Sequence, residues 1–128
     1  MSGQTTPEAQ YKPPPESACD VQVLPIELTE TDRLHIRMAI YRGKIVDFAI
    51  MQLSVRDDGE EVHVARIDCC HGTVHRHQYD RRGRDVYERR EIVAIPATDG
   101  WEVVDAAYAE ASETMFNEWE ENLRRWRQ

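Results

Sequence analysis

The chain has 128 residues, of which 41% are hydrophobic and 31% charged, which suits one globular domain with a single core. Sixteen lysines and arginines against 24 acidic residues give a formal net charge of −8, so the chain as a whole repels nucleic acid and anionic membranes. Its apolar runs are too short to span a membrane, and its N-terminus lacks the apolar core of a signal peptide, so we expect no membrane partner. Three cysteines, two of them adjacent, are typical of a reducing compartment and predict a cytoplasmic protein.

The first 20 residues predict a disordered N-terminal tail. They contain almost no apolar residue to bury, and the three consecutive prolines at 13–15 favour an extended, solvated backbone. Residues 21–128 are expected to form a single domain.

Apolar or alternating segments follow one another from residue 21 with short connections between them. The first contains Pro25, which confines it to an edge or irregular strand. Asp57-Asp58-Gly59-Glu60 is a strong hairpin signal. Connections this short allow only antiparallel pairing. The predicted strand segments, in chain order, are 21–28, 34–41, 44–55, 61–68, 73–79 and 85–95.

Residues 101–125 carry apolar side chains at helical spacing, among them Val104, Ala111, Met115 and Trp119. The predicted fold is therefore of the α+β class: a curved antiparallel sheet of about five strands covered by one long C-terminal helix. Residues 45–51 are apolar on both faces of their strand, and one helix covers only one face. We therefore expect a homodimer or a partner protein on the other face.

Positive charge is concentrated in residues 66–90, which hold seven arginines against four acids and three of the five histidines. Such a positive island would suit an anionic ligand such as a phosphodiester, although an ordinary charged hairpin gives the same composition. The predicted nucleic-acid-binding residues are Arg76, Arg81, Arg82, Arg84 and Arg89.

Residues 66–79 combine side chains suited to acid–base chemistry. Strand alternation places Thr73, His75, His77 and Tyr79 on one face, and Val74, Arg76 and Gln78 on the other. The bend at Gly72 is expected to bring the preceding segment back beside this strand. The predicted catalytic residues are His75, His77, Arg66, Asp68, His71 and Tyr79.

Three chemistries compete for this set of residues. In metal-independent RNA cleavage, one histidine accepts the 2′-hydroxyl proton, another protonates the leaving oxygen, and arginine stabilises the phosphorane. In metal binding, Asp68, Cys69 or Cys70 and the three histidines would supply ligands, although no Cys-x-x-Cys spacing is present. In the third, the side chains form only a structural polar network on the sheet.

The segment Arg66-Ile-Asp-Cys-Cys-His-Gly-Thr-Val-His-Arg-His-Gln-Tyr79 resembles a group of small uncharacterised microbial proteins. More distantly, it is similar to the TumE-like toxins of toxin–antitoxin loci, with an Arg-x-Asp segment followed by a His-rich stretch. The likeness covers residues 33–126 and implies a sheet-plus-helix domain, a ribonuclease-like or translation-directed activity and a cognate antitoxin. Ile67 and Cys69-Cys70 depart from the toxin pattern.

We therefore predict a small toxin-like protein directed at RNA, with a metal-independent endoribonuclease activity and no cofactor. His75 and His77 would form the acid–base pair, Arg66 would bind phosphate, and Asp68, His71 and Tyr79 would orient them. The expected partners are RNA, an antitoxin protein and a second copy of the chain. A non-enzymatic binding domain and a His/Cys metal-binding protein remain the alternatives.

Overall fold

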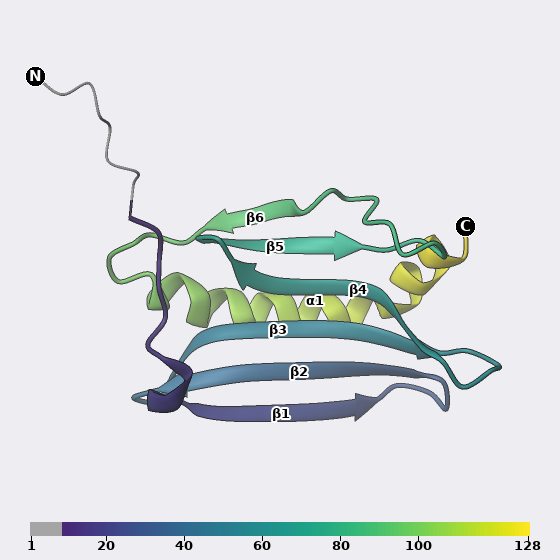
Figure 1. Ribbon diagram of the computed structural model, residues 1–128, viewed down its shortest axis with the longest axis horizontal. Coiled ribbons are helices and arrows are strands. Elements are labelled where there is room, and N and C mark those ends of the chain that lie inside the picture. Colours follow the sequence, from purple (N-terminus) through teal and green to yellow (C-terminus); the bar gives the residue numbers. More distant parts are fainter. Residues whose placement is uncertain (1–8) are drawn as a thin grey trace, which may run out of the picture.

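Six strands pair in chain order into one antiparallel sheet, and a single long helix packs on one of its faces (Figure 1). The structure is a computed structural model that describes residues 9–128. This architecture confirms the predicted α+β class, with one strand more than the five or so expected. The elements are η1 (Glu16–Ala18), β1 (Asp20–Glu27), β2 (Asp32–Tyr41), β3 (Lys44–Val55), β4 (Glu61–Cys70), β5 (Thr73–Gln78), β6 (Arg90–Ala94) and α1 (Trp101–Arg127).

Two tight turns of the same kind join β2 to β3 and β4 to β5. In each turn both central residues have positive φ: 52° and 78° at Arg42-Gly43, and 53° and 77° at His71-Gly72. Two-residue turns with this backbone match the right-handed twist of the strands that they connect. The first turn sets the register that pairs Tyr41 with Lys44, and the second sets the register that pairs Cys70 with Thr73.

The hydrophobic core lies between the sheet and α1. Strand alternation directs one set of apolar side chains toward the helix, and the apolar face of the helix packs against them. Burial of these side chains is the main stabilising term of the fold. The fully buried members of this core include Leu34, Phe48, Ile50, Val64, Ile67, Val74, Val104 and Met115.

Three amide side chains lie within this core, and each is 0% exposed: Gln52, Gln78 and Asn122, here called the amide cluster. Asn122 Nδ2 donates to Gln52 Oε1 at 3.1 Å, and Gln52 Nε2 donates to the backbone oxygen of Trp119 at 2.8 Å. Gln78 Nε2 donates to the backbone oxygen of Asn122 at 3.1 Å. These bonds fasten α1 to β3 and β5, because buried amides are stable only when they are hydrogen-bonded.

Residues 9–19 lie against the sheet, where the sequence predicted a disordered tail. The Tyr11 hydroxyl donates to the backbone oxygen of Val46 at 2.7 Å, and Glu16 pairs with Arg37 at 3.2 Å. Figure 1 shows this segment crossing the end of the sheet near the β2–β3 turn before it enters β1. Residues 1–8 of the predicted tail lie outside the described residues.

The two edges of the sheet are β1 and β6. Pro25 lies in β1, as expected for an edge strand. The strand predicted over residues 85–95 is shorter, Arg90–Ala94, and residues 79–89 form a loop instead.

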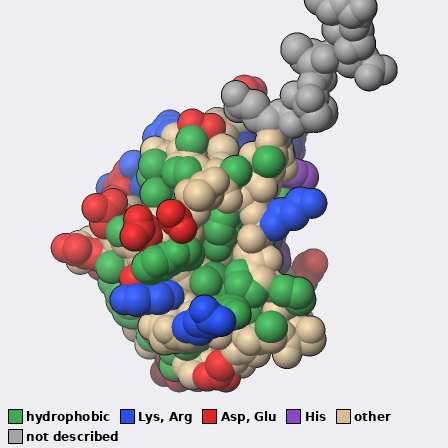
Figure 2. All heavy atoms as spheres, turned by 90° about the vertical axis from the view of Figure 1, so that its left-hand side faces the viewer, with side chains coloured by type: hydrophobic (Ala, Val, Ile, Leu, Met, Phe, Trp, Pro, Cys, Tyr) green, Lys and Arg blue, Asp and Glu red, His purple; other side chains and the backbone are tan. Residues whose placement is uncertain are grey.

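In the described part of the chain, no helix is long and apolar enough to cross a membrane. At the end of the molecule seen in Figure 2, hydrophobic side chains lie interspersed with acidic and basic ones.

Candidate functional site

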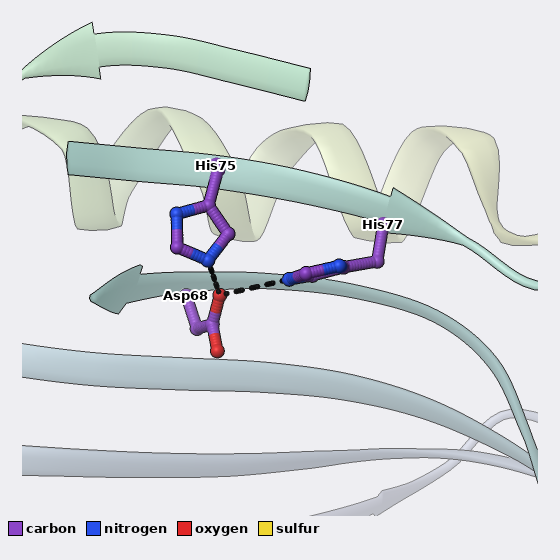
Figure 3. A group of neighbouring side chains, drawn as sticks. All are labelled: Asp68, His75 and His77. Carbon is purple, nitrogen blue, oxygen red and sulfur yellow. Dashed lines mark ion pairs between the residues drawn. The ribbon is translucent and has the colours of Figure 1, made fainter. Parts of the chain in front are cut away.

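Asp68, His75 and His77 meet on the face of the sheet opposite α1, and are here called the carboxylate–histidine cluster. The β4–β5 register sets Asp68 opposite His75 and Arg66 opposite His77. Both histidines point their Nε2 atoms at the same Asp68 oxygen, Oδ1, at 2.8 Å from His75 and 3.4 Å from His77 (Figure 3). The rings of the two histidines meet edge to face with their centroids 4.9 Å apart.

Each of the other polar atoms in the cluster has its own partner. Asp68 Oδ2 pairs with Arg66 Nε at 2.7 Å. His77 Nδ1 lies 2.7 Å from Asp85 Oδ2, and His75 Nδ1 lies 3.1 Å from the Thr73 hydroxyl. These contacts fix the orientation of both rings, so that the Nε2 atoms remain directed at Asp68 Oδ1.

Asp85 is itself held by the loop between β5 and β6. Its carboxylate accepts backbone N–H bonds from Gln78, Tyr87 and Arg89 at 3.2, 3.0 and 2.9 Å. Burial acts to raise the pKa of Asp85, but the hydrogen bonds from His77 and from these N–H groups outweigh it and hold this pKa below its ordinary value. Asp85 is therefore a fixed, ionised acceptor for His77.

The cluster is largely withdrawn from solvent. His75 is 3% exposed and Asp68 is 6% exposed, whereas the side chain of His77 keeps 12%. Burial lowers the pKa of His75, the Asp68 carboxylate opposes this, and the positive charges of His77, Arg89 and Arg66 lower it further. The neutral form of His75 is thus favoured near neutral pH.

Tyr79 connects the cluster with a hollow beside it. Its ring stacks on His77 with an interplanar angle of 3° and a centroid separation of 5.9 Å, and burial raises the pKa of its hydroxyl. The hollow has a volume of about 660 Å³ and is here called the basic hollow. Its charged and aromatic lining residues are Arg56, Glu60, Glu61, His63, Arg66, Tyr79, Asp80, Arg81, Arg82 and Trp126.

Five of the six predicted catalytic residues lie together: Arg66, Asp68, His75, His77 and Tyr79. The sixth, His71, occupies the first central position of the β4–β5 turn with φ 53° and is exposed. Histidine is among the few residues that accept this left-handed backbone, so the turn explains His71 without a role in the site.

The predicted nucleic-acid-binding arginines are divided between different surroundings. Arg81 and Arg82 line the basic hollow, whereas Arg84 pairs with Asp80 at 2.9 Å. Arg76 lies on the helix face, where it donates to Glu118 and Asn122, and so it does not join the others. Arg89 enters the site through its backbone N–H to Asp85 and through its charge near His75.

The sequence reasoning gave no role to Thr73, Asp85, His63 or Arg56. Thr73 was placed on the correct face, but its hydroxyl contact with His75 was not anticipated. The sequence predicts Asp85 as the first residue of a strand. Its position after an Asp-Arg-Arg-Gly turn was the available signal, since aspartates near turns commonly bind backbone N–H groups.

Close polar contacts at both nitrogens of each ring restrict what the histidines can do as a simple acid–base pair. Both nitrogens of His75 are engaged, by Thr73 and Asp68, and both nitrogens of His77 face carboxylates. Neither ring therefore presents a free nitrogen to a substrate in this arrangement. What the cluster offers is three ligand atoms that converge on one point.

A six-stranded antiparallel sheet with a helix on one face and a buried carboxylate–histidine cluster on the other defines the class of protein: an α+β domain with a polar site on its open sheet face. The chain belongs to the family whose model is described as a domain of unknown function, DUF7718, which matches residues 19–127. Comparison with curated proteins and with solved structures gave no match. The similarity to TumE-like toxins stays a prediction.

Proposed function

We propose that the chain binds RNA in the basic hollow and cleaves it at the adjoining carboxylate–histidine cluster. The proposal rests on one observation: two residues that line the basic hollow also contact the carboxylate–histidine cluster. Arg66 lines the hollow and also pairs with Asp68, and Tyr79 lines the hollow and also stacks on His77. A phosphate bound in the hollow would therefore lie next to the cluster.

The charge balance of the basic hollow favours an anion. Two of its acids are already paired, Glu61 with Arg33 at 3.4 Å and Asp80 with Arg84. Within residues 9–128, the lining arginines 56, 81 and 82 form no ion pair. Arginine binds phosphate through its planar fork of donors, and a partly exposed Tyr79 offers a stacking surface for a base.

Arg66 and His77 are the groups of the site best placed to act on a bound phosphodiester. The Arg66 side chain is 35% exposed, and its guanidinium would stabilise the charge that develops on phosphorus oxygens. His77 is more exposed than His75, so we assign His77 to the substrate side, where its Nε2 would have to turn away from Asp68 to exchange a proton, and His75 to positioning Asp68.

Binding is tested with a fluorescent single-stranded RNA and measured by polarisation at 50 and 200 mM salt. Three to four phosphate contacts predict a loss of affinity of roughly 20- to 50-fold between these conditions. The Arg81→Ala/Arg82→Ala variant should bind weakly and depend less on salt. Arg42→Ala, in the β2–β3 turn at the other end of the sheet, is the matched control. Binding that is salt-insensitive, or equal in both variants, would remove the hollow from the proposal.

Cleavage is tested by incubating total RNA with the wild type and with His77→Gln, whose folding is checked by circular dichroism. The proposal expects fragments only with the wild type. RNA binding without turnover in either protein would instead favour the alternative of a non-enzymatic binding domain.

We also propose a cytoplasmic location and two protein assemblies, a homodimer and a complex with an antitoxin. Both edge strands support such assemblies, because each carries exposed apolar side chains beside unpaired backbone groups. These side chains are Val23 and Leu24 in β1, and Ile92 and Val93 in β6. Light scattering of the purified chain, alone and with a co-purified partner, tests both assemblies.

A further inference from the structure

We infer that Asp68 Oδ1, His75 Nε2 and His77 Nε2 together bind one divalent first-row transition-metal ion. The inference rests on the proposed function for its catalytic meaning, because the ion would be the cofactor of the same cluster. Metal binding itself is measured without RNA. If the inference holds, RNA cleavage would depend on the metal ion, in place of the metal-independent cleavage predicted from the sequence.

The three atoms are spaced as ligands of one ion. They lie within 4.8 Å of one another, and the separations from Asp68 Oδ1 to the two Nε2 atoms are 2.8 and 3.4 Å. An ion about 2.0–2.2 Å from each nitrogen and oxygen ligand would set these atoms roughly 3.0–3.5 Å apart. The shorter separation must open by a few tenths of an ångström, and the two Nε2 atoms, which lie within 4.8 Å of each other, must come to about 3.5 Å.

The second ring nitrogens of the histidines are held as in known metal sites. Asp85 accepts backbone N–H bonds on both oxygens, so it also acts as the acceptor toward His77 Nδ1, which must carry a proton. A neutral His77 then has its lone pair on Nε2, aimed at Asp68 Oδ1. A carboxylate behind a histidine in this way is the usual outer partner of a metal-binding imidazole.

His75 has an equivalent outer partner in the Thr73 hydroxyl, 3.1 Å from Nδ1. That hydroxyl also donates to the backbone oxygen of Cys70 at 3.2 Å, which leaves its oxygen free to accept Nδ1–H. The lone pair of His75 would then also face Asp68. Two lone pairs directed at one carboxylate oxygen repel unless a proton or a cation lies between them.

The competing explanation is a proton. If His77 were an imidazolium between Asp68 and Asp85, and His75 donated Nε2–H to Asp68, the cluster would be a structural ion network. Three features favour the metal ion over the proton. Both histidines face Asp68 Oδ1 through Nε2, and both have an outer partner on Nδ1. Arg66 pairs with Asp68 Oδ2 and leaves Oδ1 to the histidines. A metal centre explains all three together.

The three ligands also limit which metal ions the site would bind. Two imidazole nitrogens and one carboxylate oxygen suit zinc, iron(II) or manganese(II), whereas magnesium and calcium prefer oxygen ligands alone. Three protein ligands leave coordination positions for water or substrate, as in catalytic rather than structural sites. Neither cysteine of the adjacent pair lies in the group, so a thiolate site for copper(I) is not expected.

The test uses the full chain, stripped with chelator and titrated with zinc and, separately, with manganese by calorimetry. We expect one ion per chain for the wild type and at least 100-fold weaker binding for His77→Gln. Thr73→Val and Asp85→Asn should each weaken binding by about 10- to 100-fold, as outer partners do. His71→Gln removes an exposed histidine three residues from Asp68 and should bind as the wild type does.

No binding of either ion at 1 mM, or equal binding by wild type and His77→Gln, would overturn the inference. If His77→Gln does not fold, as judged by circular dichroism, the Thr73→Val variant decides, because it removes only an outer hydroxyl. Metal binding without RNA binding would overturn the proposed function alone. RNA cleavage by the chelated protein would overturn the catalytic role of the ion and leave the proposed function standing.

Discussion

Two buried polar clusters lie on opposite faces of the sheet, and they differ in kind. The amide cluster, on the helix face, consists of neutral side chains whose donors meet backbone or side-chain oxygens. The carboxylate–histidine cluster, on the open face, aims two imidazole nitrogens at a single carboxylate oxygen. The first arrangement holds the helix through neutral hydrogen bonds, and Gln78 Oε1 is its one amide oxygen without a partner among the described residues. The second requires a proton or a cation between its members.

The difference separates a structural role from a functional one. Neutral amides between a sheet and a helix gain from every hydrogen bond and fix the position of the helix. A buried carboxylate with two histidines is costly in a purely structural role, because removing charge from water is seldom repaid by ion pairing alone. We therefore place the function on the open face.

The largest effect on stability is expected at the centre of the amide cluster. Asn122→Leu leaves Gln52 Oε1 without its donor and removes one of the two acceptors of Arg76, and should lower the free energy of unfolding by about 3 kcal/mol. Urea denaturation measures this change. Asn117→Leu, on the exposed side of the same helix, is the control and should change stability by less than about 0.5 kcal/mol. A loss below 1 kcal/mol at Asn122 would show that the amides do not fasten the helix.

A comparable gain is expected at the carboxylate–histidine cluster. Zinc at 100 times its dissociation constant should raise the free energy of unfolding of the wild type by about 2.7 kcal/mol, because only the folded chain assembles the three ligands. Urea denaturation with and without zinc measures the gain. An equal gain in His77→Gln would place the ion elsewhere.

A smaller effect is expected for Tyr11, which belongs to neither cluster and secures the N-terminal segment. Tyr11→Phe removes the hydrogen bond to Val46 and should cost about 1 kcal/mol near pH 8. Burial raises the pKa of Tyr11 from 10.0 to about 12, so the unfolded chain ionises first as pH rises. The advantage of the wild type should therefore be complete below pH 10 and decline toward pH 12. A constant difference across this range would contradict the burial of the hydroxyl.

The smallest effect on stability is expected in the basic hollow. Arg81 and Arg82 are exposed, so Arg81→Ala/Arg82→Ala should change the free energy of unfolding by less than about 0.5 kcal/mol. The same variant should reduce the slope of log affinity for RNA against log salt by about 1.4, which corresponds to two lost phosphate contacts on a single strand. Thermal denaturation and polarisation titrations separate the two effects, and an unchanged slope would exclude these arginines as phosphate ligands.

Strand periodicity was sufficient to predict most of the open-face cluster. The alternation of residues 73–79 placed His75 and His77 on one face, and the short connection at Gly72 placed Asp68 beside them. Strand alternation also separated Arg76 from this face, as the structure confirms. The error at His71 arose because the turn type, rather than the strand, determines where that side chain points.

The remaining parts depend on contacts that sequence spacing does not encode. Asp85 reaches His77 because the turn after Tyr79 brings Asp85 back into a bridge with Tyr79. The positive φ values at Glu88 and Arg89, which local sequence does not specify, then return the Arg89 N–H to the Asp85 carboxylate. The amide cluster joins Gln78 to Asn122 across 44 residues, so it follows from the docking of the helix on the sheet. The convergence of both Nε2 atoms on one oxygen likewise cannot be predicted from spacing, because contacts with Thr73 and Asp85 set the orientation of the two rings.

The central claim, that the open-face cluster is a metal centre, is tested most directly by crystals of the zinc-loaded chain, with anomalous diffraction recorded at the zinc edge. The account predicts one strong peak between β4 and β5, about 2.0–2.2 Å from Asp68 Oδ1 and from the Nε2 atoms of His75 and His77. A peak at His71 or at another surface histidine, with His77 Nε2 still 3.4 Å from Asp68 and no density between them, would contradict it.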